Sequence, residues 1–115
     1  MNLVPAAVLC RRQGFFSLEP LNRYEHFFVN TASEAVELVR EVGSPNLKVH
    51  LDTYHMNIEE KSIRGAVVCA RGLLCHVHAS ENDRSIPGTG HIDWDGLFGG
   101  LAEIAEVSLN GRRLG

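Results

Sequence analysis

The sequence predicts an α/β fold in which three parallel strands alternate with three helices. Short segments at 15–19, 47–51 and 73–78 have the length and the apolar or alternating pattern of strands. Apolar residues at helical spacing follow each of them. Because strands that alternate with helices form a parallel sheet through right-handed crossovers, we expect the order β-α-β-α-β-α in one domain.

The first helix is the most clearly marked one, and it follows a polar and aromatic loop at 21–30. Thr31 and Glu34 have the spacing of a capping box, which satisfies backbone donors at a helix N-terminus. Gly43 and Pro45 then supply a stop. The residues on its apolar face are Ala32, Ala35, Val36, Val39 and Val42.

A second helix is expected from Ile58 or Ser62 to Arg71, with Glu59 and Glu60 at its N-terminus, where negative charge is favourable.

A polar loop at 81–91 precedes a third helix, from Asp93 to Glu106, in which Trp94 anchors the start to the core. Glycines in this helix weaken it by about 1 kcal/mol each relative to alanine. We expect the tail at 108–115 to fray.

Composition excludes several classes of function. The 115 residues are 44% hydrophobic and 22% charged with a net charge of −3, and they suit one domain. No basic run suggests nucleic-acid binding, and no apolar stretch is long enough for a membrane span. At the N-terminus, Arg11 and Arg12 follow the apolar residues, whereas a secretory signal places its charge first. We therefore expect a cytoplasmic protein.

Three cysteines without a C-x-x-C pair suggest reduced thiols, which we expect to be buried as small hydrophobic side chains: Cys10, Cys69 and Cys75. A zinc site in the segment 75–78 is an alternative, but it lacks a second pair of ligands.

Each predicted strand ends in a residue type that binds metals. These residues are Glu19, Asp52 and His78, about 30 residues apart, which is the length of one strand–helix unit. Because parallel strands end at the same edge of a sheet, we expect the three side chains to converge. Two carboxylates and an imidazole suit a divalent ion such as Mn²⁺, Co²⁺ or Mg²⁺. The alternative is that each is an ordinary surface or hydrogen-bonded residue.

Three further polar residues lie just after the strands, where loops frame a site: Glu25, His55 and Arg84. Such side chains hold hydroxyl or carbonyl oxygens by directed hydrogen bonds. Taken singly, each such residue is more often a solvated loop residue.

Specific motifs occur at Leu18–Glu25, Asn30–Ala35, Val49–Glu60, His76–Arg84 and Pro87–Gly88. In these motifs the chain resembles the ketose 3-epimerases, a group that includes the D-tagatose and D-psicose (allulose) 3-epimerases. They belong to the xylose isomerase-like sugar isomerase/epimerase superfamily. The similarity extends from about residue 18 to about residue 106, and it implies that the chain forms part of a TIM (β/α)₈ barrel.

The resemblance implies a role for each candidate residue. Glu19, Asp52 and His78 match ligands of a catalytic divalent metal, and Glu19 also matches one of two carboxylates that move the proton at C3 of a ketose. The substrate-binding residues it implies are Glu25, His55 and Arg84. The reaction implied is removal and return of the C3 proton through an enediolate.

The chain departs from the family in extent. A (β/α)₈ barrel needs about 250 residues, so the chain supplies about three of the eight units. The family's second catalytic glutamate has no counterpart after Glu106. We therefore expect a truncated or frame-shifted chain with little or no activity alone.

Two alternatives remain open at this stage. One is a non-catalytic half-barrel that forms homo-oligomers through its open face. The other is an enzyme related to hydroxypyruvate isomerases or inosose dehydratases.

Overall fold

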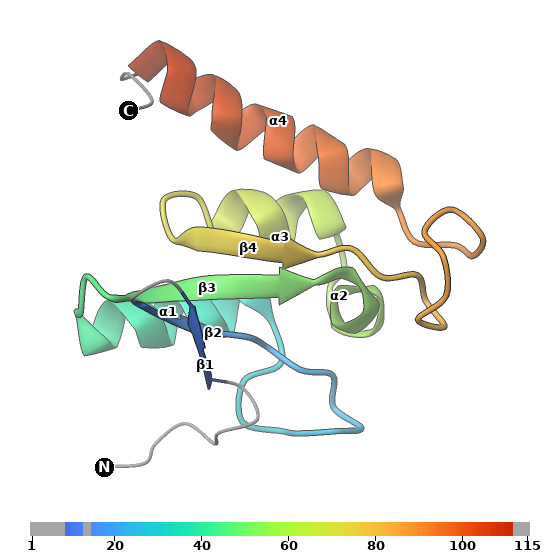
Figure 1. The fold of residues 1–115 in the computed structure, drawn as a ribbon, viewed down its shortest axis with the longest axis horizontal. Coiled ribbons are helices and arrows are strands. Elements are labelled where there is room, and N and C mark those ends of the chain that lie inside the picture. Colours follow the sequence, from blue (N-terminus) through green and yellow to red (C-terminus); the bar gives the residue numbers. More distant parts are fainter. Residues whose placement is uncertain (1–8, 13–14, 112–115) are drawn as a thin grey trace.

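The chain forms one sheet with helices along one of its faces in a computed structural model, which describes residues 9–12 and 15–111 (Figure 1). Its elements in chain order are β1 (Leu9–Arg12), β2 (Phe15–Leu18), α1 (Ala32–Val42), β3 (Leu47–Asp52), α2 (Thr53–Glu59), α3 (Ile63–Cys69), β4 (Leu74–His78) and α4 (Trp94–Gly111).

The strand order β1-β2-β3-β4 confirms the predicted α/β class and the parallel sheet. β2 pairs with β3 in parallel, and β3 pairs with β4 in parallel. The arrows of β3 and β4 point the same way in Figure 1. β1 was not predicted from the sequence, and it pairs with β2 antiparallel. Its four residues carry no helical or alternating apolar signal of their own.

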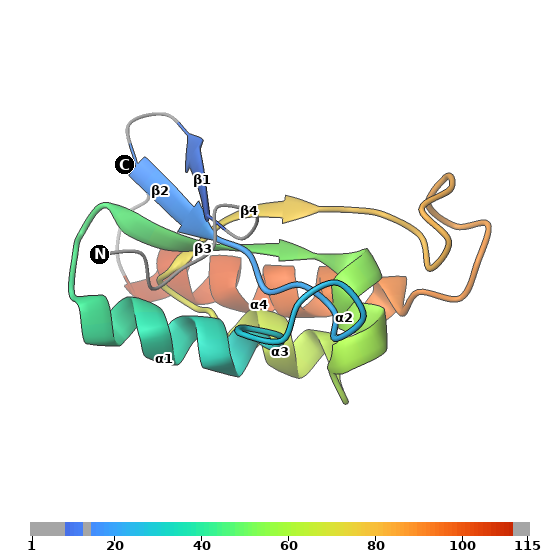
Figure 2. The same cartoon turned by 90° about the horizontal axis from the view of Figure 1, so that it is seen from below.

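Helices α1, α3 and α4 lie on one side of the sheet (Figure 2), and no helix of the described residues covers the other side. The core fills the space between this helical layer and the strands. Its strand residues include Leu18, Val49 and Leu51, which are fully buried against α1 and α3. Among the described residues no helix is both long and apolar enough to cross a membrane.

The helix predicted from Ile58 or Ser62 to Arg71 is confirmed as α3, which begins just after Ser62. The prediction that it is the single helix between β3 and β4 is wrong, because α2 precedes it. Asp52 caps the N-terminus of α2 by accepting the N–H of Tyr54, and Ser62 caps α3 by accepting the N–H of Gly65. Glu60 lies between them in an extended conformation. Each short helix therefore begins at its own capping side chain, and the extended Glu60 separates them.

The placement of the two glutamates at the start of this second helix is also wrong. Glu59 is the last residue of α2, and it accepts hydrogen bonds from the backbone and guanidinium of Arg23. Glu60 accepts the N–H of Ala32 at 2.7 Å, so its charge favours the N-terminus of α1 instead. The capping box predicted at Thr31 and Glu34 is confirmed.

Helix α4 continues to Gly111, beyond the predicted end at Glu106, and residues 112–115 of the predicted tail lie outside the described residues. It packs on α3 where Gly100 faces Val67. A Cβ on Gly100 would lie 3.0 Å from the Cβ of Val67 and 3.2 Å from the carbonyl oxygen of Arg64. The glycine that weakens the helix thus permits this close approach.

The prediction that the cysteines are buried is wrong for Cys69, which is exposed at the last turn of α3. Cys75 is half-buried, and the side chain of Cys10 lies outside the described residues.

Candidate functional site

The site lies where β2, β3 and β4 end, and Asp52 is at its centre. The side chain of Asp52 is 1% exposed, and its Oδ1 accepts the N–H of Tyr54 at 2.9 Å. Its Oδ2 lies 3.3 Å from Nδ1 of His78 and 3.1 Å from Nη1 of Arg84. One oxygen therefore completes the helix cap, while the other faces the polar cluster.

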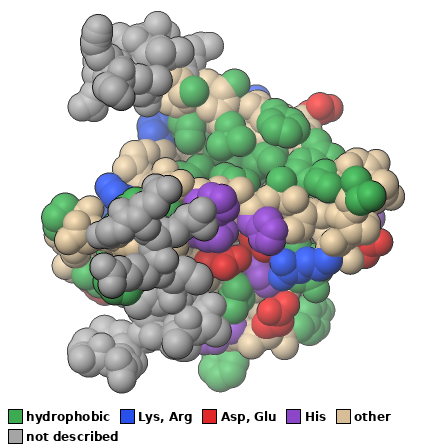
Figure 3. Space-filling view, in the orientation of Figure 1, with side chains coloured by type: hydrophobic (Ala, Val, Ile, Leu, Met, Phe, Trp, Pro, Cys, Tyr) green, Lys and Arg blue, Asp and Glu red, His purple; other side chains and the backbone are tan. Residues whose placement is uncertain are grey.

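The register of the sheet brings His78 to this position. Asp52 of β3 and His78 of β4 are partners in the parallel ladder, and His50 and His76 are partners two residues earlier. The imidazole of His78 is 57% exposed, so one side of the site is open to solvent. Figure 3 shows histidine, acidic and basic side chains gathered near the middle of this face, next to a hydrophobic area.

Glu19 follows β2 and approaches the same space. Its Oε2 lies 4.0 Å from Nε2 of His55, and its side chain is 15% exposed. Burial, and then the negative charge of Asp52, raise the pKa of Glu19 to about 7, against the opposing effect of Arg84. A carboxyl group with a pKa near neutrality can both accept and return a proton at physiological pH.

His55 presents a particular ring atom to the site. Its Nδ1 lies 3.0 Å from the backbone nitrogen of Asn22, whose N–H can only donate, so Nδ1 accepts. Burial lowers the pKa of His55 and favours the neutral ring. The single ring proton therefore resides on Nε2, the nitrogen that faces Glu19.

Arg84 and His55 present two donors side by side. Nη2 of Arg84 lies 3.3 Å from Nε2 of His55. Since both atoms carry hydrogens, this contact is not a hydrogen bond, and the pair suits an oxygen acceptor placed between them. The guanidinium also lies over the ring of Tyr54, 4.0 Å from its centroid, an arrangement typical of cation–π contacts.

Glu25 joins the cluster through Asn22. Oδ1 of Asn22 accepts the N–H of Tyr24 at 2.9 Å, which directs its Nδ2 toward His55. Nδ2 donates to Oε2 of Glu25 at 3.1 Å. The fold thus brings each residue predicted for the site into one contiguous cluster.

Three residues outside the strand-end pattern also shape the site: Asn22, Tyr54 and Glu81. Asn22 begins the string Asn-Arg-Tyr-Glu, which ends in Glu25, and Tyr54 lies in Asp-Thr-Tyr-His between Asp52 and His55. Their closeness to these candidate residues in the sequence is the signal that could have identified them. Glu81 is fully buried, which no local pattern indicates.

The donor set fits a divalent cation. Ligand-type atoms of Glu19, Asp52 and His55 lie within 4.8 Å of one another, although the Nε2 of His55 carries the ring proton. Burial and then the negative charge of Asp52 raise the pKa of Glu19, and a cation bound between the two carboxylates would relieve their repulsion. Carboxylate oxygens with an imidazole suit Mn²⁺, Co²⁺ or Mg²⁺, although this chemistry does not select one of them. Among the residues that the structure describes, the zinc alternative at 75–78 forms no such group. His78 stands outside the group of three but adjoins it, with its Nδ1 3.3 Å from Oδ2 of Asp52.

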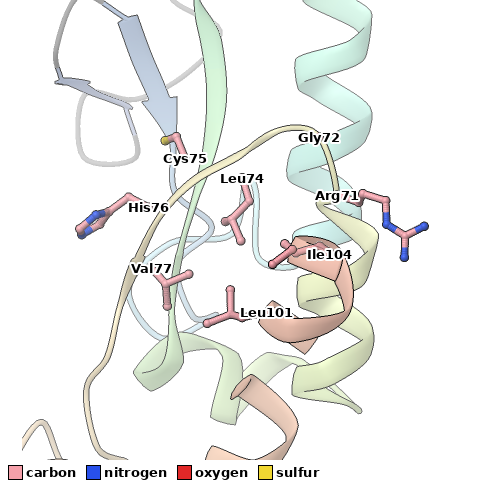
Figure 4. A pocket seen from close by; sticks show the side chains of 9 residues that line it. Arg71, Gly72, Leu74, Cys75, His76, Val77, Leu101 and Ile104 are labelled. Atoms are coloured by element: carbon pink, nitrogen blue, oxygen red, sulfur yellow. The ribbon is translucent and has the colours of Figure 1, made fainter. Parts of the chain in front are cut away.

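A cavity of about 520 Å³ lies away from this cluster, between β4 and α4 (Figure 4). The side chains of Leu74, Val77, Leu101 and Ile104 converge on it. It contains none of the candidate site residues, and its apolar lining suits packing against another polypeptide segment better than binding a sugar.

Comparison with known proteins places the chain in a family. A sequence model described as "Xylose isomerase-like TIM barrel" matches residues 2–106. D-psicose 3-epimerase of Ruminiclostridium cellulolyticum is 49% identical over 89 residues, which are 77% of this chain and 30% of that protein. D-psicose 3-epimerase of Agrobacterium fabrum is 46% identical over 87 residues, which are 76% of this chain and 30% of the relative.

A solved structure agrees with these similarities. The crystal structure of D-psicose 3-epimerase with D-tagatose from Clostridium cellulolyticum matches with a TM-score of 0.75 at 48% identity, covering 77% of this chain and 31% of that chain. The chain thus spans about 30% of the length of the curated relatives that it matches. Sequence and structure together show that the chain belongs to the xylose isomerase-like TIM barrel family.

Proposed function

We propose that the chain carries part of the catalytic site of a ketose 3-epimerase. The observation that supports this most directly is the position of Glu19: its Oε2 lies 4.0 Å from Nε2 of His55, where two donors converge. A base of this kind suits removal of a proton next to a carbonyl group, and the donors suit the sugar oxygens. The names of the relatives, D-psicose 3-epimerases, indicate the substrate class.

Glu19, Asp52 and His78 are the residues that we assign to the metal. Since the hydrogen bond from Asn22 leaves the proton of His55 on Nε2, His55 lacks a free lone pair toward the carboxylates. His78, with Nδ1 3.3 Å from Oδ2 of Asp52, is then the imidazole that completes the set. A divalent cation held there would act as a Lewis acid toward the oxygens at C2 and C3 of a ketose.

The other residues hold the substrate and move its proton. Nε2–H of His55 and the guanidinium of Arg84 donate to sugar oxygens, and Glu25, anchored by Asn22, accepts from a hydroxyl group. Glu19 takes the proton from C3. Inversion at C3 requires a proton to return from the opposite face, and we assign no second acid for this step among the described residues.

The first test is metal binding by the whole chain. We expect Mn²⁺ to bind in isothermal titration calorimetry and to raise the midpoint of thermal unfolding, because ligands of the folded state stabilise it. Asp52→Asn and His78→Ala should each weaken binding at least tenfold, which is about 1.4 kcal/mol. Asp95→Asn, on an exposed acid at the start of α4, is the matched control. Equal Mn²⁺ affinity in all three variants would refute the ligand assignment.

The second test is turnover. We expect little or no conversion of D-fructose to D-psicose by this chain with Mn²⁺, because one carboxylate cannot both remove the C3 proton from one face and deliver a proton to the opposite face. We expect D-psicose itself to bind, and Arg84→Met to weaken that binding. Ready epimerisation by the chain alone would show that the assignment of a single acid–base residue is wrong.

A non-catalytic module that self-associates is the second candidate. The apolar cavity between β4 and α4 lies beside an edge strand, and exposed strand edges favour pairing with another chain. Size-exclusion chromatography with light scattering should then give a mass above that of a 12.7 kDa monomer, independent of Mn²⁺. A monomer across the concentration range would exclude this candidate.

A further inference from the structure

A buried carboxylate outside the metal cluster organises the loop that carries Arg84. Glu81 is fully buried, and four N–H groups converge on it. Its Oε1 accepts from the backbone of Asn82 and Ile92, and its Oε2 accepts from the backbone of Gly88 and from Nε1 of Trp94. These donors come from both ends of the loop that leaves β4 and returns at α4 (Figure 1).

The loop closes tightly around this carboxylate. A Cβ on Gly90 would lie 1.9 Å from Oδ1 of Asn82 and 2.7 Å from Cγ of Glu81, so only glycine fits there. Oδ1 of Asn82 accepts the N–H of His91, which ties the two sides of the loop together. The charge of Glu81 is balanced by hydrogen-bond donors rather than by a cation, and the hydrogen bonds hold its pKa at about 2.

Arg84 occupies this loop in a conformation that needs support. Its φ of 70° is in the left-handed region, which is unfavourable for a residue with a side chain. The carbonyl oxygen of Glu81 accepts the N–H of Arg84 at 2.9 Å. From this backbone position the guanidinium reaches Asp52 and lies over Tyr54.

We propose that Glu81 is a positioning residue for Arg84: its buried carboxylate closes the loop at 82–93 and thereby holds the guanidinium against Asp52 and His55. The use of Arg84 in sugar binding rests on the proposed function, whereas its position does not. The carboxylate of Glu81 accepts its hydrogen bonds from the loop and from Trp94, not from the residues of the cluster. Removing its charge should release Arg84 while the sheet and α3 stay folded.

The experiment compares Glu81→Gln with the unmodified chain by limited digestion with trypsin, which must accept the arginine side chain to cleave. Cleavage after Arg84, relative to cleavage after the exposed Arg71, should rise about tenfold, because proteolysis follows the population of the open loop. Glu37→Gln, which removes an exposed carboxylate on α1, should leave the ratio unchanged.

An NMR readout reports the side chain directly. In the unmodified chain the ring of Tyr54 should shift the Arg84 Nε–H resonance, which is assigned by its absence in Arg84→Met. Glu81→Gln should abolish this ring-current shift. If the shift and the cleavage ratio both stay unchanged, the positioning role is refuted.

A second variant covers the case in which Glu81→Gln fails to fold. Gly90→Ala pushes the loop away from the carboxylate and leaves its charge in place, so it should raise the same cleavage ratio. An unchanged ratio in folded Gly90→Ala would overturn the proposal.

Sugar binding then separates this inference from the proposed function. With Mn²⁺ present, Glu81→Gln and Arg84→Met should each weaken D-psicose binding about tenfold, and the double variant should bind no more weakly than Arg84→Met. If the losses of D-psicose affinity in the two single variants multiply in the double variant, the claim that Glu81 acts through Arg84 is overturned. Absence of D-psicose binding by the unmodified chain would overturn the assigned substrate, while the cleavage ratio would still decide the role of Glu81.

Discussion

Metal binding at the candidate site should depend on pH through Glu19. A metal ligand must be ionised, and the pKa of this carboxyl group is raised to about 7 by burial and by Asp52. About one tenth of Glu19 is therefore ionised at pH 6 and about nine tenths at pH 8. From this group alone, the apparent affinity for Mn²⁺ should fall roughly tenfold between pH 8 and pH 6.

The assay is calorimetric titration with Mn²⁺ at several pH values, in buffers that differ in ionisation enthalpy. Binding at pH 6 should release about one proton from Glu19, and binding at pH 8 almost none. Glu19→Gln should remove this contribution along with part of the affinity, and Glu103→Gln, which keeps the site intact, should retain it. If Glu19→Gln releases as many protons at pH 6 as the unmodified chain, the reasoning is refuted.

Three further outcomes are expected. In metal-free protein, the raised pKa of Glu19 stabilises the fold below about pH 4.5, and this contribution is lost as the pH rises through about 7. The lowered pKa of Glu81 has the opposite effect. It stabilises the fold above about pH 4.5, and this contribution is lost as the pH falls toward 2. In urea titrations, the free energy of unfolding of Glu19→Gln should therefore depend less on pH above pH 4.5 than that of the unmodified chain. That of Glu81→Gln should depend less on pH below pH 4.5. Gly100→Ala should lower the free energy of unfolding by about 1–3 kcal/mol through overpacking. Gly99→Ala should raise it by up to about 1 kcal/mol, because its Cβ meets only the flexible end of an arginine side chain. Equal effects of the two substitutions in urea titrations would contradict the packing argument. Thr31→Ala should destabilise the fold by about 1 kcal/mol, measured in the same way, and an unchanged value would show that the capping box is dispensable.

Local patterns in the sequence account for the main elements of the fold. The capping box at Thr31, the left-handed Gly43 and the strand ending in Asp52 are where they were expected, because each depends on neighbours within one or two turns. Ser62 was one of the two predicted starts of α3, whereas α2 was not predicted. Its seven residues are mostly polar, so no apolar pattern marks them.

The sequence by itself determined the parallel α/β class and the phase of Glu19, Asp52 and His78, since strand alternation and strand length set which residues end together. Only the tertiary structure decided the chemical state of the site. The proton on Nε2 of His55 follows from a backbone donor 33 residues away, and the raised pKa of Glu19 follows from burial beside a second carboxylate. Such properties depend on which groups approach one another in space, so no local pattern carries them.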